Sequence, residues 1–304
     1  MAFREIYQRQ VALLVRVLPV IAEEREFALK GGTAINLFVR DMPRLSVDID
    51  LTYLPIAPRP QSLTAIDAAM KRMATNIERS IVGSKVTLAT PREGAVQKLF
   101  VRADGVQIKI EVTPVLRGTV FDPRDMVVVP LVEETFGFAE TQVVSFADLY
   151  AGKLVAALDR QHPRDLFDGR GLLAREGIDP ALRQAFVVYM LSHHRPMAEV
   201  LAPPRKELAE VFAREFEGMT AEPVALDDLI EAREALIANI VGGMPAEHRR
   251  FMLEFESGEP DWTLLGLPGV AELPAVKWRR HNLDKLSTEK RKALVEQLAE
   301  VLSG

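Results

Sequence analysis

Two short polar motifs in the first fifth of the chain contain the residue types that phosphate chemistry needs. The first is Gly31, Gly32 and Thr33, and the second is Asp48 and Asp50. A glycine pair that opens a helix offers backbone N–H groups to phosphate oxygens. Two carboxylates one residue apart on a strand point to the same face, where they can hold divalent cations. Together the motifs indicate nucleotidyl transfer, because that reaction needs a bound triphosphate next to metal ions.

Glu111 offers a third carboxylate in the same kind of position. Residues 106–115 alternate apolar and polar side chains, which predicts a strand with Glu111 on its polar face. Nucleotidyl transfer is an in-line displacement at an α-phosphorus, and two Mg²⁺ ions held by carboxylates on a rigid sheet suit it. We therefore predict that Asp48, Asp50 and Glu111 bind Mg²⁺ and act in catalysis; a solvated strand face is the alternative.

The glycine motif has a functional and a structural interpretation. Gly31, Gly32 and Thr33 follow a short apolar run and precede a predicted helix, so they are candidates for binding the triphosphate of an NTP. In that interpretation Thr33 adds a hydroxyl near the outer phosphates. The alternative is an ordinary strand-to-helix turn in which Thr33 is only the N-cap.

A lysine and two aspartates follow in a predicted helical region. Lys153 lies on a helix expected at 146–160, where its ammonium group could neutralise the β- and γ-phosphates as a point charge. Asp165 and Asp168 share one face near the start of the next helix. They could position Lys153, bind the base or ribose of the nucleotide, or only interact with the helix dipole. A solvated helix face is the alternative for the lysine, and spacing alone leaves these interpretations open.

Composition narrows the class of protein. The chain has 304 residues, of which 48% are hydrophobic and 27% charged, as in globular proteins that bury a core. The net charge of −5 argues against a non-specific DNA-binding protein but permits a local basic patch. The absence of cysteine excludes disulfides, thiolate zinc sites and cysteine nucleophiles, and it is compatible with a cytoplasmic location.

Two further segments have structural explanations. The apolar run 11–15 is interrupted by Arg16 and followed by Pro19, so it predicts a packing helix and not a signal or membrane segment. We expect no transmembrane segment elsewhere. Residues 277–281 mix basic and aromatic side chains and are expected to form a charged surface loop; contact with an RNA backbone or base is the alternative.

The spacing of apolar residues predicts an α/β (α+β) fold in which a mixed sheet flanked by helices precedes a mostly α-helical C-terminal domain. Strands are expected at 27–29, 46–53, 85–90, 97–103 and 106–115, the last two joined by a hairpin turn at Asp104 and Gly105. After the opening helix, further helices are expected at 33–40, 62–80, 146–160, 164–175, 180–192, 205–217, 227–241, 246–256 and 287–302. The change in character gives a first domain at 1–145 and a helical domain at 146–304.

Five segments of this chain resemble the AbiEii/AbiGii family of nucleotidyltransferase-like toxins, which belongs to the DNA polymerase β-type nucleotidyltransferase superfamily. The most specific match is the first block, segments 29–38 and 44–51, which contains both motifs described above. The matching segments are 29–38, 44–51, 108–112, 151–153 and 164–168. They occur in the expected order over about residues 27–170.

This resemblance implies a bi-lobed, Mg²⁺-dependent enzyme with a nucleotidyltransferase-like sheet domain and a helical domain that adds nucleotide and acceptor contacts. By motif, the implied roles are triphosphate binding for Gly32 and Thr33, metal binding for Asp48 and Asp50, a third acidic position for Glu111, a nucleotide lysine for Lys153, and a late acidic motif for Asp165 or Asp168. Serine is common in the superfamily where this chain has Thr33, and the hydroxyl is retained.

The resemblance also implies a biological role. Some relatives add nucleotides to the acceptor end of tRNA and thereby block translation, and family members are usually encoded beside a cognate antitoxin. The implied function is that of a cytoplasmic toxin of a toxin–antitoxin (abortive-infection) system. It transfers a nucleotide from an NTP to an RNA 3′ end, and tRNA is the favoured acceptor. Two alternatives are a nucleotidyltransferase that modifies a protein or small-molecule hydroxyl, and a non-catalytic nucleotide-binding module.

Overall fold

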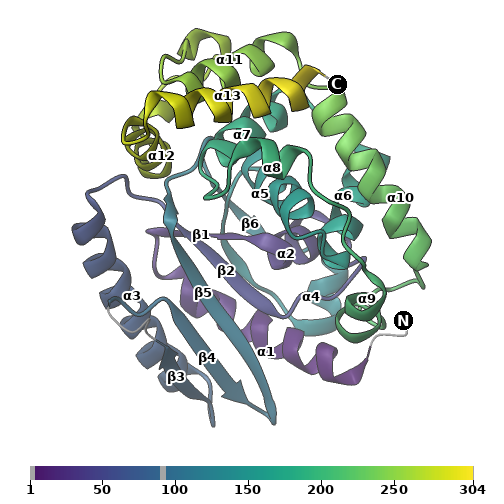
Figure 1. Cartoon of the computed structure of the whole chain (residues 1–304). Coiled ribbons are helices and arrows are strands. Elements are labelled where there is room, and N and C mark those ends of the chain that lie inside the picture. The colour runs from purple at the N-terminus through teal and green to yellow at the C-terminus, as the bar shows by residue number, and fades with distance from the viewer. Residues whose placement is uncertain (1–3, 90–93, 304) are drawn as a thin grey trace. The chain divides into compact units, whose positions relative to one another are not determined.

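The computed structural model of the chain describes residues 4–89 and 94–303 (Figure 1). The chain divides into two compact units. The first comprises Met1–Ser145 together with Glu217–Pro223, and the second comprises Phe146–Phe216 and Val224–Gly304. The short segment 217–223 thus belongs with the first unit, although its sequence is embedded in the helical region. Thr90, the last residue of one expected strand, lies outside the described residues.

A mixed sheet of seven strands, counted over the described ranges, forms the centre of the first unit. Its order is β3-β4-β5-β2-β1-β7-β6 (Figure 1). The strands are β1 Phe27–Lys30, β2 Asp48–Tyr53, β3 Lys85–Ala89, β4 Lys98–Ala103, β5 Val106–Arg117, β6 Arg124–Val127 and β7 Glu140–Val143. β2 runs parallel to β5 and antiparallel to β1, so the strands that carry the predicted polar residues are neighbours.

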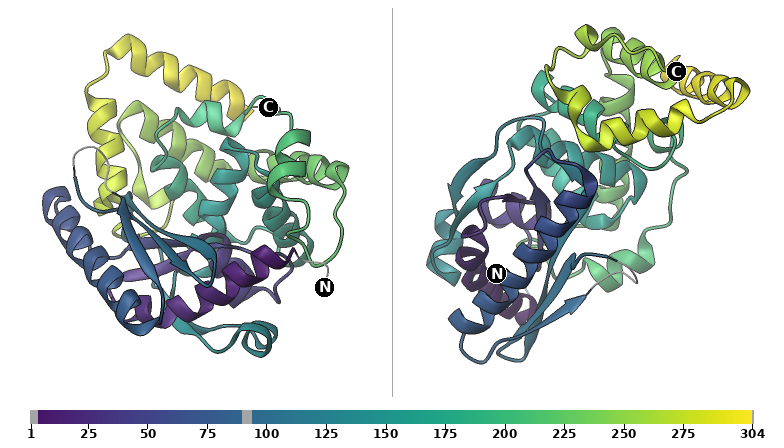
Figure 2. Two further views of the ribbon diagram at one scale, coloured as in Figure 1. Left: turned by 90° about the horizontal axis from the view of Figure 1, so that it is seen from below. Right: turned by 90° about the vertical axis from the view of Figure 1, so that its left-hand side faces the viewer.

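Alternation along the strands gives this sheet one apolar and one polar face. Ile49 on β2 and Ile110 on β5 are completely buried. The helices α1 (Glu5–Ala22) and α3 (Arg59–Ser80) pack against the strands and against each other (Figure 2). Because successive side chains on a strand point to opposite faces, the polar residues of β2 and β5 lie on the face that these two helices do not cover.

The expected turns at residues 104–105 and at Gly31 are confirmed, and the backbone is left-handed at both. Asp104 and Gly105 join β4 to β5 with φ values of 52° and 74°, as a type I′ hairpin turn requires. Gly31 has φ 75° and directly follows β1. The helix α2 (Gly31–Ala34) starts there, two residues earlier than expected, and continues as a π-helical turn, Ile35–Val39.

Three short elements between residues 116 and 144 were not predicted: β6, α4 (Pro130–Phe136) and β7. Each has only four to seven residues, too few for a hydrophobic period to show. The returning segment 217–223 was also missed. It pairs with the chain ahead of β2 through an isolated antiparallel bridge between Arg44 and Thr220.

The second unit is helical. Its helices are α5 Phe146–Asp159, α6 Pro163–Arg175, α7 Pro180–Leu191, α8 Met197–Leu201, α9 Ala209–Glu215, α10 Leu226–Ile237, α11 Ala246–Ser257, α12 Pro274–Asp284 and α13 Thr288–Ser303. α5 packs against α6, α7, α8 and α10, which explains why most of its residues are buried. The expectation of a surface loop at 277–281 is wrong, because these residues lie within α12. Within the described ranges, the structure has no helix with both the length and the apolar character needed to cross a membrane.

Candidate functional site

A row of four charged residues crosses the polar face of the sheet. Asp50 on β2 lies in register with Lys30 on β1 and with Glu111 on β5. Lys98 on β4 lies in register with Glu111 on its other side. Neighbouring strands are about 4.8 Å apart, so Lys30, Asp50, Glu111 and Lys98 form a continuous charged row. The predicted carboxylates Asp50 and Glu111 are thus side by side.

Two lysines hold Glu111. Lys98 Nζ lies 2.9 Å from Glu111 Oε1, and Lys109 Nζ lies 2.9 Å from Glu111 Oε2. Lys109 Nζ is also 3.9 Å from Asp48 Oδ2. Burial alone would raise the pKa of Glu111, but hydrogen bonds from the two ammonium groups outweigh it and hold the pKa below its usual value. Glu111 is therefore ionised at neutral pH.

Sequence reasoning did not assign a role to these lysines. Alternation along the strand places Lys109 on the same face as Glu111, but the contact of Lys98 depends on the order of the strands. Lys30 was also missed, although it directly precedes the glycine motif. Burial lowers the pKa of Lys30, and the carboxylates of Asp50 and Glu111 act in the opposite direction. The polar face therefore combines carboxylates, which are donors of the kind that Mg²⁺ prefers, with cations of the kind that attract phosphate.

The donor set suits a divalent cation in part. Asp48 and Asp50 offer carboxylate oxygens from one face of β2, which are the donors that Mg²⁺ prefers. Both oxygens of Glu111 already accept from lysines. No group of three or more His, Cys, Asp or Glu side chains in the described part of the chain is arranged to hold a metal ion. Asp48 and Asp50 therefore fit as ligands, whereas Glu111 has to release a lysine first, and its metal role stays a prediction.

The glycines of the first motif allow the backbone to approach the second motif closely. A Cβ atom at Gly31 would lie 2.6 Å from Asp50 Oδ2. One at Gly32 would lie 2.6 Å from Arg44 Nη2 and 2.9 Å from Ser46 Oγ. Side chains at either position would collide with these groups. The Asp50 carboxylate therefore occupies the space that a side chain at the start of α2 would need.

Thr33 links the two motifs through its hydroxyl. Thr33 Oγ1 donates to the backbone carbonyl of Asp48 at 2.5 Å and lies 3.1 Å from Ser46 Oγ. Its side chain is buried. The observed contact fixes the start of β2 relative to the glycine turn, and the predicted contact of Thr33 with an outer phosphate stays a prediction.

We expect Gly31→Ala to lower nucleotidyl transfer far more than it lowers stability. The matched control is Gly83→Ala, because Gly83 has the same φ of 75° but no described heavy atom within 4 Å of its added Cβ. Both changes carry a left-handed backbone cost of about 1–2 kcal/mol, but only Gly31→Ala displaces the Asp50 carboxylate. Comparison of thermal unfolding and nucleotide incorporation in the two variants tests this. Equal activity of the two variants would contradict it.

In the second unit the structure brings together the three other predicted residues. Lys153 Nζ lies 2.9 Å from Asp165 Oδ1 and 3.0 Å from Asp168 Oδ2. Their relative exposures are 8%, 2% and 4%, so Lys153, Asp165 and Asp168 form a buried triad. Arg160 Nη2 lies 2.8 Å from Asp165 Oδ2. Burial would raise the pKa of Asp165, but Lys153 and Arg160 lower it to about 2.

The contacts within the triad agree with one of the roles that the spacing left open for the aspartates, which is to position Lys153. Both aspartates contact the Lys153 ammonium group, so each is placed to position it. Contacts of Asp165 or Asp168 with a nucleotide, and of Lys153 with phosphates, stay predictions. Arg160, the residue after α5, is mostly exposed, so its ion pair joins the buried Asp165 to a side chain that also faces solvent.

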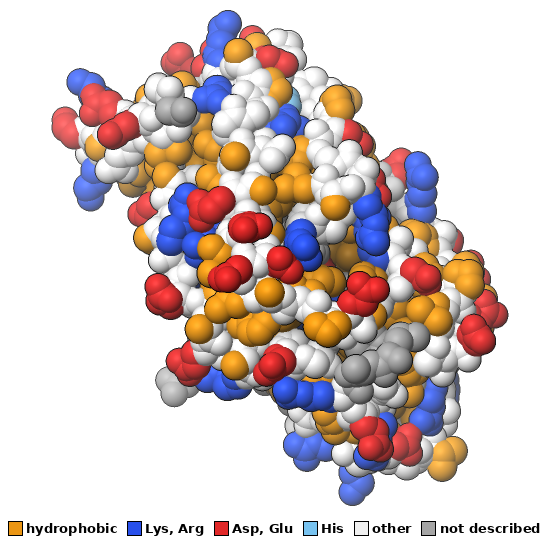
Figure 3. All heavy atoms as spheres, turned by 90° about the vertical axis from the view of Figure 1, so that its right-hand side faces the viewer, with side chains coloured by type: hydrophobic (Ala, Val, Ile, Leu, Met, Phe, Trp, Pro, Cys, Tyr) orange, Lys and Arg blue, Asp and Glu red, His pale blue; other side chains and the backbone are white. Residues whose placement is uncertain are grey.

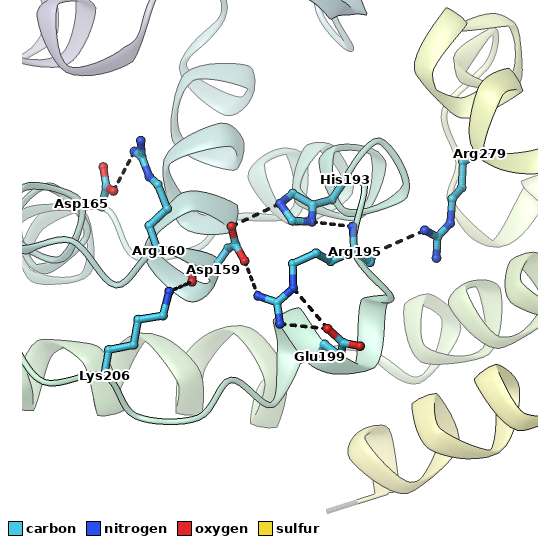
Figure 4. A network of polar contacts seen from close by, with 8 residues as sticks. All are labelled: Asp159, Arg160, Asp165, His193, Arg195, Glu199, Lys206 and Arg279. Atoms are coloured by element: carbon cyan, nitrogen blue, oxygen red, sulfur yellow. Dashed lines mark hydrogen bonds and ion pairs between the residues drawn. The ribbon is translucent and has the colours of Figure 1, made fainter. Parts of the chain in front are cut away.

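A further polar network anchors the C-terminal end of α5 (Figure 4). The Asp159 carboxylate lies 2.5 Å from Arg195 Nη1 and 3.6 Å from His193 Nε2, and Lys206 Nζ donates to the Asp159 carbonyl at 2.8 Å. Burial acts to raise the pKa of Asp159, but the hydrogen bond from Arg195 and the nearby charges of His193, Arg195 and Lys206 together lower it. The network was missed because its members are far apart in the sequence. It holds the helix that carries Lys153.

Comparisons with known proteins identify the family. The family described as Nucleotidyl transferase AbiEii toxin, Type IV TA system, matches residues 12–280. Among solved structures, MenT4, the nucleotidyltransferase toxin Rv2826c from Mycobacterium tuberculosis H37Rv, shares the fold with a TM-score of 0.58 and 16% identity, covering 97% of this chain and 93% of that chain. A tRNA-processing enzyme (apo form I) aligns over 96% of this chain and 97% of that chain at 13% identity with a TM-score of 0.25. No curated protein matches the sequence significantly. Since the family match covers most of the chain, this protein belongs to the AbiEii nucleotidyltransferase toxins of type IV toxin–antitoxin systems.

Proposed function

We propose that this toxin transfers a nucleotide from an NTP to the 3′ end of tRNA in the cytoplasm, using Mg²⁺, and thereby blocks translation. The observation that carries the proposal is the close approach of the Asp50 carboxylate to Gly31, where it occupies the space of a side chain. A triphosphate held by the glycine turn would lie next to the Asp50 carboxylate. This is the arrangement that a metal-assisted displacement at phosphorus needs.

Two carboxylates and three lysines on the polar face have roles in the proposed reaction. The RNA 3′ hydroxyl oxygen forms a bond to the α-phosphorus, and the bond from that phosphorus to the leaving pyrophosphate breaks. Asp48 and Asp50 would hold Mg²⁺, which supplies charge neutralisation at the phosphates and lowers the pKa of the attacking hydroxyl. Lys30, Lys98 and Lys109 place positive charge along the face that receives the triphosphate, where lysines bind phosphate as point charges.

The toxin family supports the proposed partner, and the chemistry of the reaction supports the proposed acceptor. A type IV toxin is paired with an antitoxin, so we propose a cognate antitoxin as its protein partner. A folded RNA such as tRNA offers a free 3′ terminus with the hydroxyl that the reaction requires. The chain carries a net charge of −5, and acidic and basic side chains are interspersed on the face drawn in Figure 3. RNA binding therefore has to depend on a local basic surface.

Incubation of the purified protein with each α-labelled NTP, total tRNA and Mg²⁺ tests the proposal. We expect label in the RNA, release of pyrophosphate, loss of incorporation with EDTA and recovery with added Mg²⁺. Label in a protein or small molecule with none in RNA would overturn the tRNA acceptor. Binding of NTP with no transfer to any acceptor would indicate a non-catalytic nucleotide-binding module.

A further inference from the structure

One side of α12 carries a set of exposed residues that its packing does not use. Lys277, Trp278 and His281 of α12 and Lys285, the residue directly after the helix, are all exposed. Lys285 keeps a helical backbone, so at 3.6 residues per turn the four lie on one side. We call this set the outer face of α12. Trp278 is one of two tryptophans in the chain and is 59% exposed. Its ring centroid lies 5.8 Å from that of His281, so the two rings form one aromatic surface.

The opposite side of α12 explains how the helix is held. Its buried residues are Ala275, Val276 and Leu283. Arg279 also turns inward: its Nη2 lies 3.2 Å from Glu256 Oε1, and its Nη1 donates to the Arg195 carbonyl at 3.3 Å (Figure 4). Lys277 makes only an exposed ion pair with Glu272, which water and salt screen. The outer face is therefore dispensable for packing.

The local charge is opposite to the charge of the whole chain. Between residues 274 and 285 there are four Lys or Arg residues and one acidic residue, Asp284. Two of the four pair with carboxylates, Lys277 with Glu272 and Arg279 with Glu256, so the local positive charge comes mainly from Arg280 and Lys285. Asp284 lies 3.1 Å from Arg291, so it is neutralised by a neighbouring helix. A basic surface with an exposed indole ring matches a ligand that has both phosphates and stackable rings. Unpaired RNA has both, since its bases can stack on aromatic side chains.

We infer that the outer face of α12 binds an unpaired stretch of the RNA acceptor, with one base stacked on Trp278 and phosphates near Lys277 and Lys285. This inference rests on the proposed RNA acceptor. It gives the toxin a contact with RNA that does not depend on the reacting 3′ terminus. An acidic surface of the antitoxin is the competing occupant, and the experiment below separates the two.

Binding of fluorescent tRNA to four variants tests the inference. We expect Trp278→Ala to weaken RNA binding about tenfold, because stacking of one base on an aromatic side chain contributes that much or more, and Trp278→Phe to keep most of the affinity. Lys285→Ala should lower the slope of log affinity against log salt by about one. The matched control is Lys292→Ala, which removes an exposed lysine from α13 and should change neither quantity. NTP affinity should be unchanged in all four.

A second measurement detects contact at Trp278 directly. In a Trp262→Phe background Trp278 is the sole tryptophan, and we expect RNA to protect its fluorescence from acrylamide quenching. Equal RNA affinity of Trp278→Ala and wild type would overturn the inference, and so would protection of Trp278 by antitoxin but not by RNA. The proposed function fails separately: RNA that binds through Trp278 but is never labelled would keep the inference and refute the acceptor role.

Discussion

Asp50→Asn is expected to lower the rate of nucleotidyl transfer by about 10³-fold or more while leaving the first unit folded. A metal-binding carboxylate supports several kcal/mol of charge stabilisation in the transition state, and about 4 kcal/mol corresponds to this factor. Asparagine keeps the shape of the side chain that Gly31 contacts, so the glycine turn is retained. The loss of one negative charge beside Lys30 and Glu111 should leave NTP binding unchanged or make it tighter.

A lower rate of transfer without a loss of NTP affinity distinguishes a catalytic role of Asp50 from a structural one. Single-turnover incorporation of labelled nucleotide, NTP affinity, and Mn²⁺ affinity by EPR should be measured together. Asp125→Asn is the matched control, because Asp125 is a half-exposed carboxylate of the same unit that pairs with Arg25 at 2.7 Å. We expect wild-type rates for it. If Asp50→Asn kept its rate within tenfold of wild type, or lost NTP binding and rate equally, the proposed metal role of Asp50 would be wrong.

Individual strands and turns of the first unit were predictable, because the residues within each of them determine its conformation. Strand alternation identified β2 and β5, and Asp104 with Gly105 identified the hairpin between β4 and β5. The same alternation placed Glu111 on the polar face. The order of the strands depends on contacts between distant segments, which no local pattern encodes. For this reason the register of Asp50 with both Lys30 and Glu111, and the contact of Lys98, emerged only from the structure.

In the second unit, too, residue types were predictable but tertiary contacts were not. Lys153, Asp165 and Asp168 were found by type and spacing, but their burial as one triad was not, because the angle between α5 and α6 is a tertiary property. α12 was missed because its inner face is held partly by the polar contact of Arg279 with Glu256. A helix held by a polar contact shows no regular apolar stripe. Sequence patterns therefore selected the candidate residues, whereas the contacts between these residues emerged only from the structure.

Lys153→Met is expected to destabilise the second unit by about 3–5 kcal/mol, the usual cost of removing one partner from a buried ion pair. The change leaves the carboxylates of Asp165 and Asp168 buried with one less cation, and Arg160 compensates only Asp165. Both tryptophans lie in the second unit. Urea unfolding followed by tryptophan fluorescence therefore reports on this unit.

A compensating variant shows whether charge or volume causes the loss. Lys153→Met combined with Asp168→Asn removes one cation and one anion, and leaves Asp165 with Arg160. We expect this double variant to recover most of the stability lost in Lys153→Met, since the two residues interact directly and their effects are not additive. Recovery of stability without recovery of nucleotidyl transfer would assign Lys153 a role beyond packing. If the double variant were no more stable than Lys153→Met, the buried charges would not be the cause, and the triad would not be a unit.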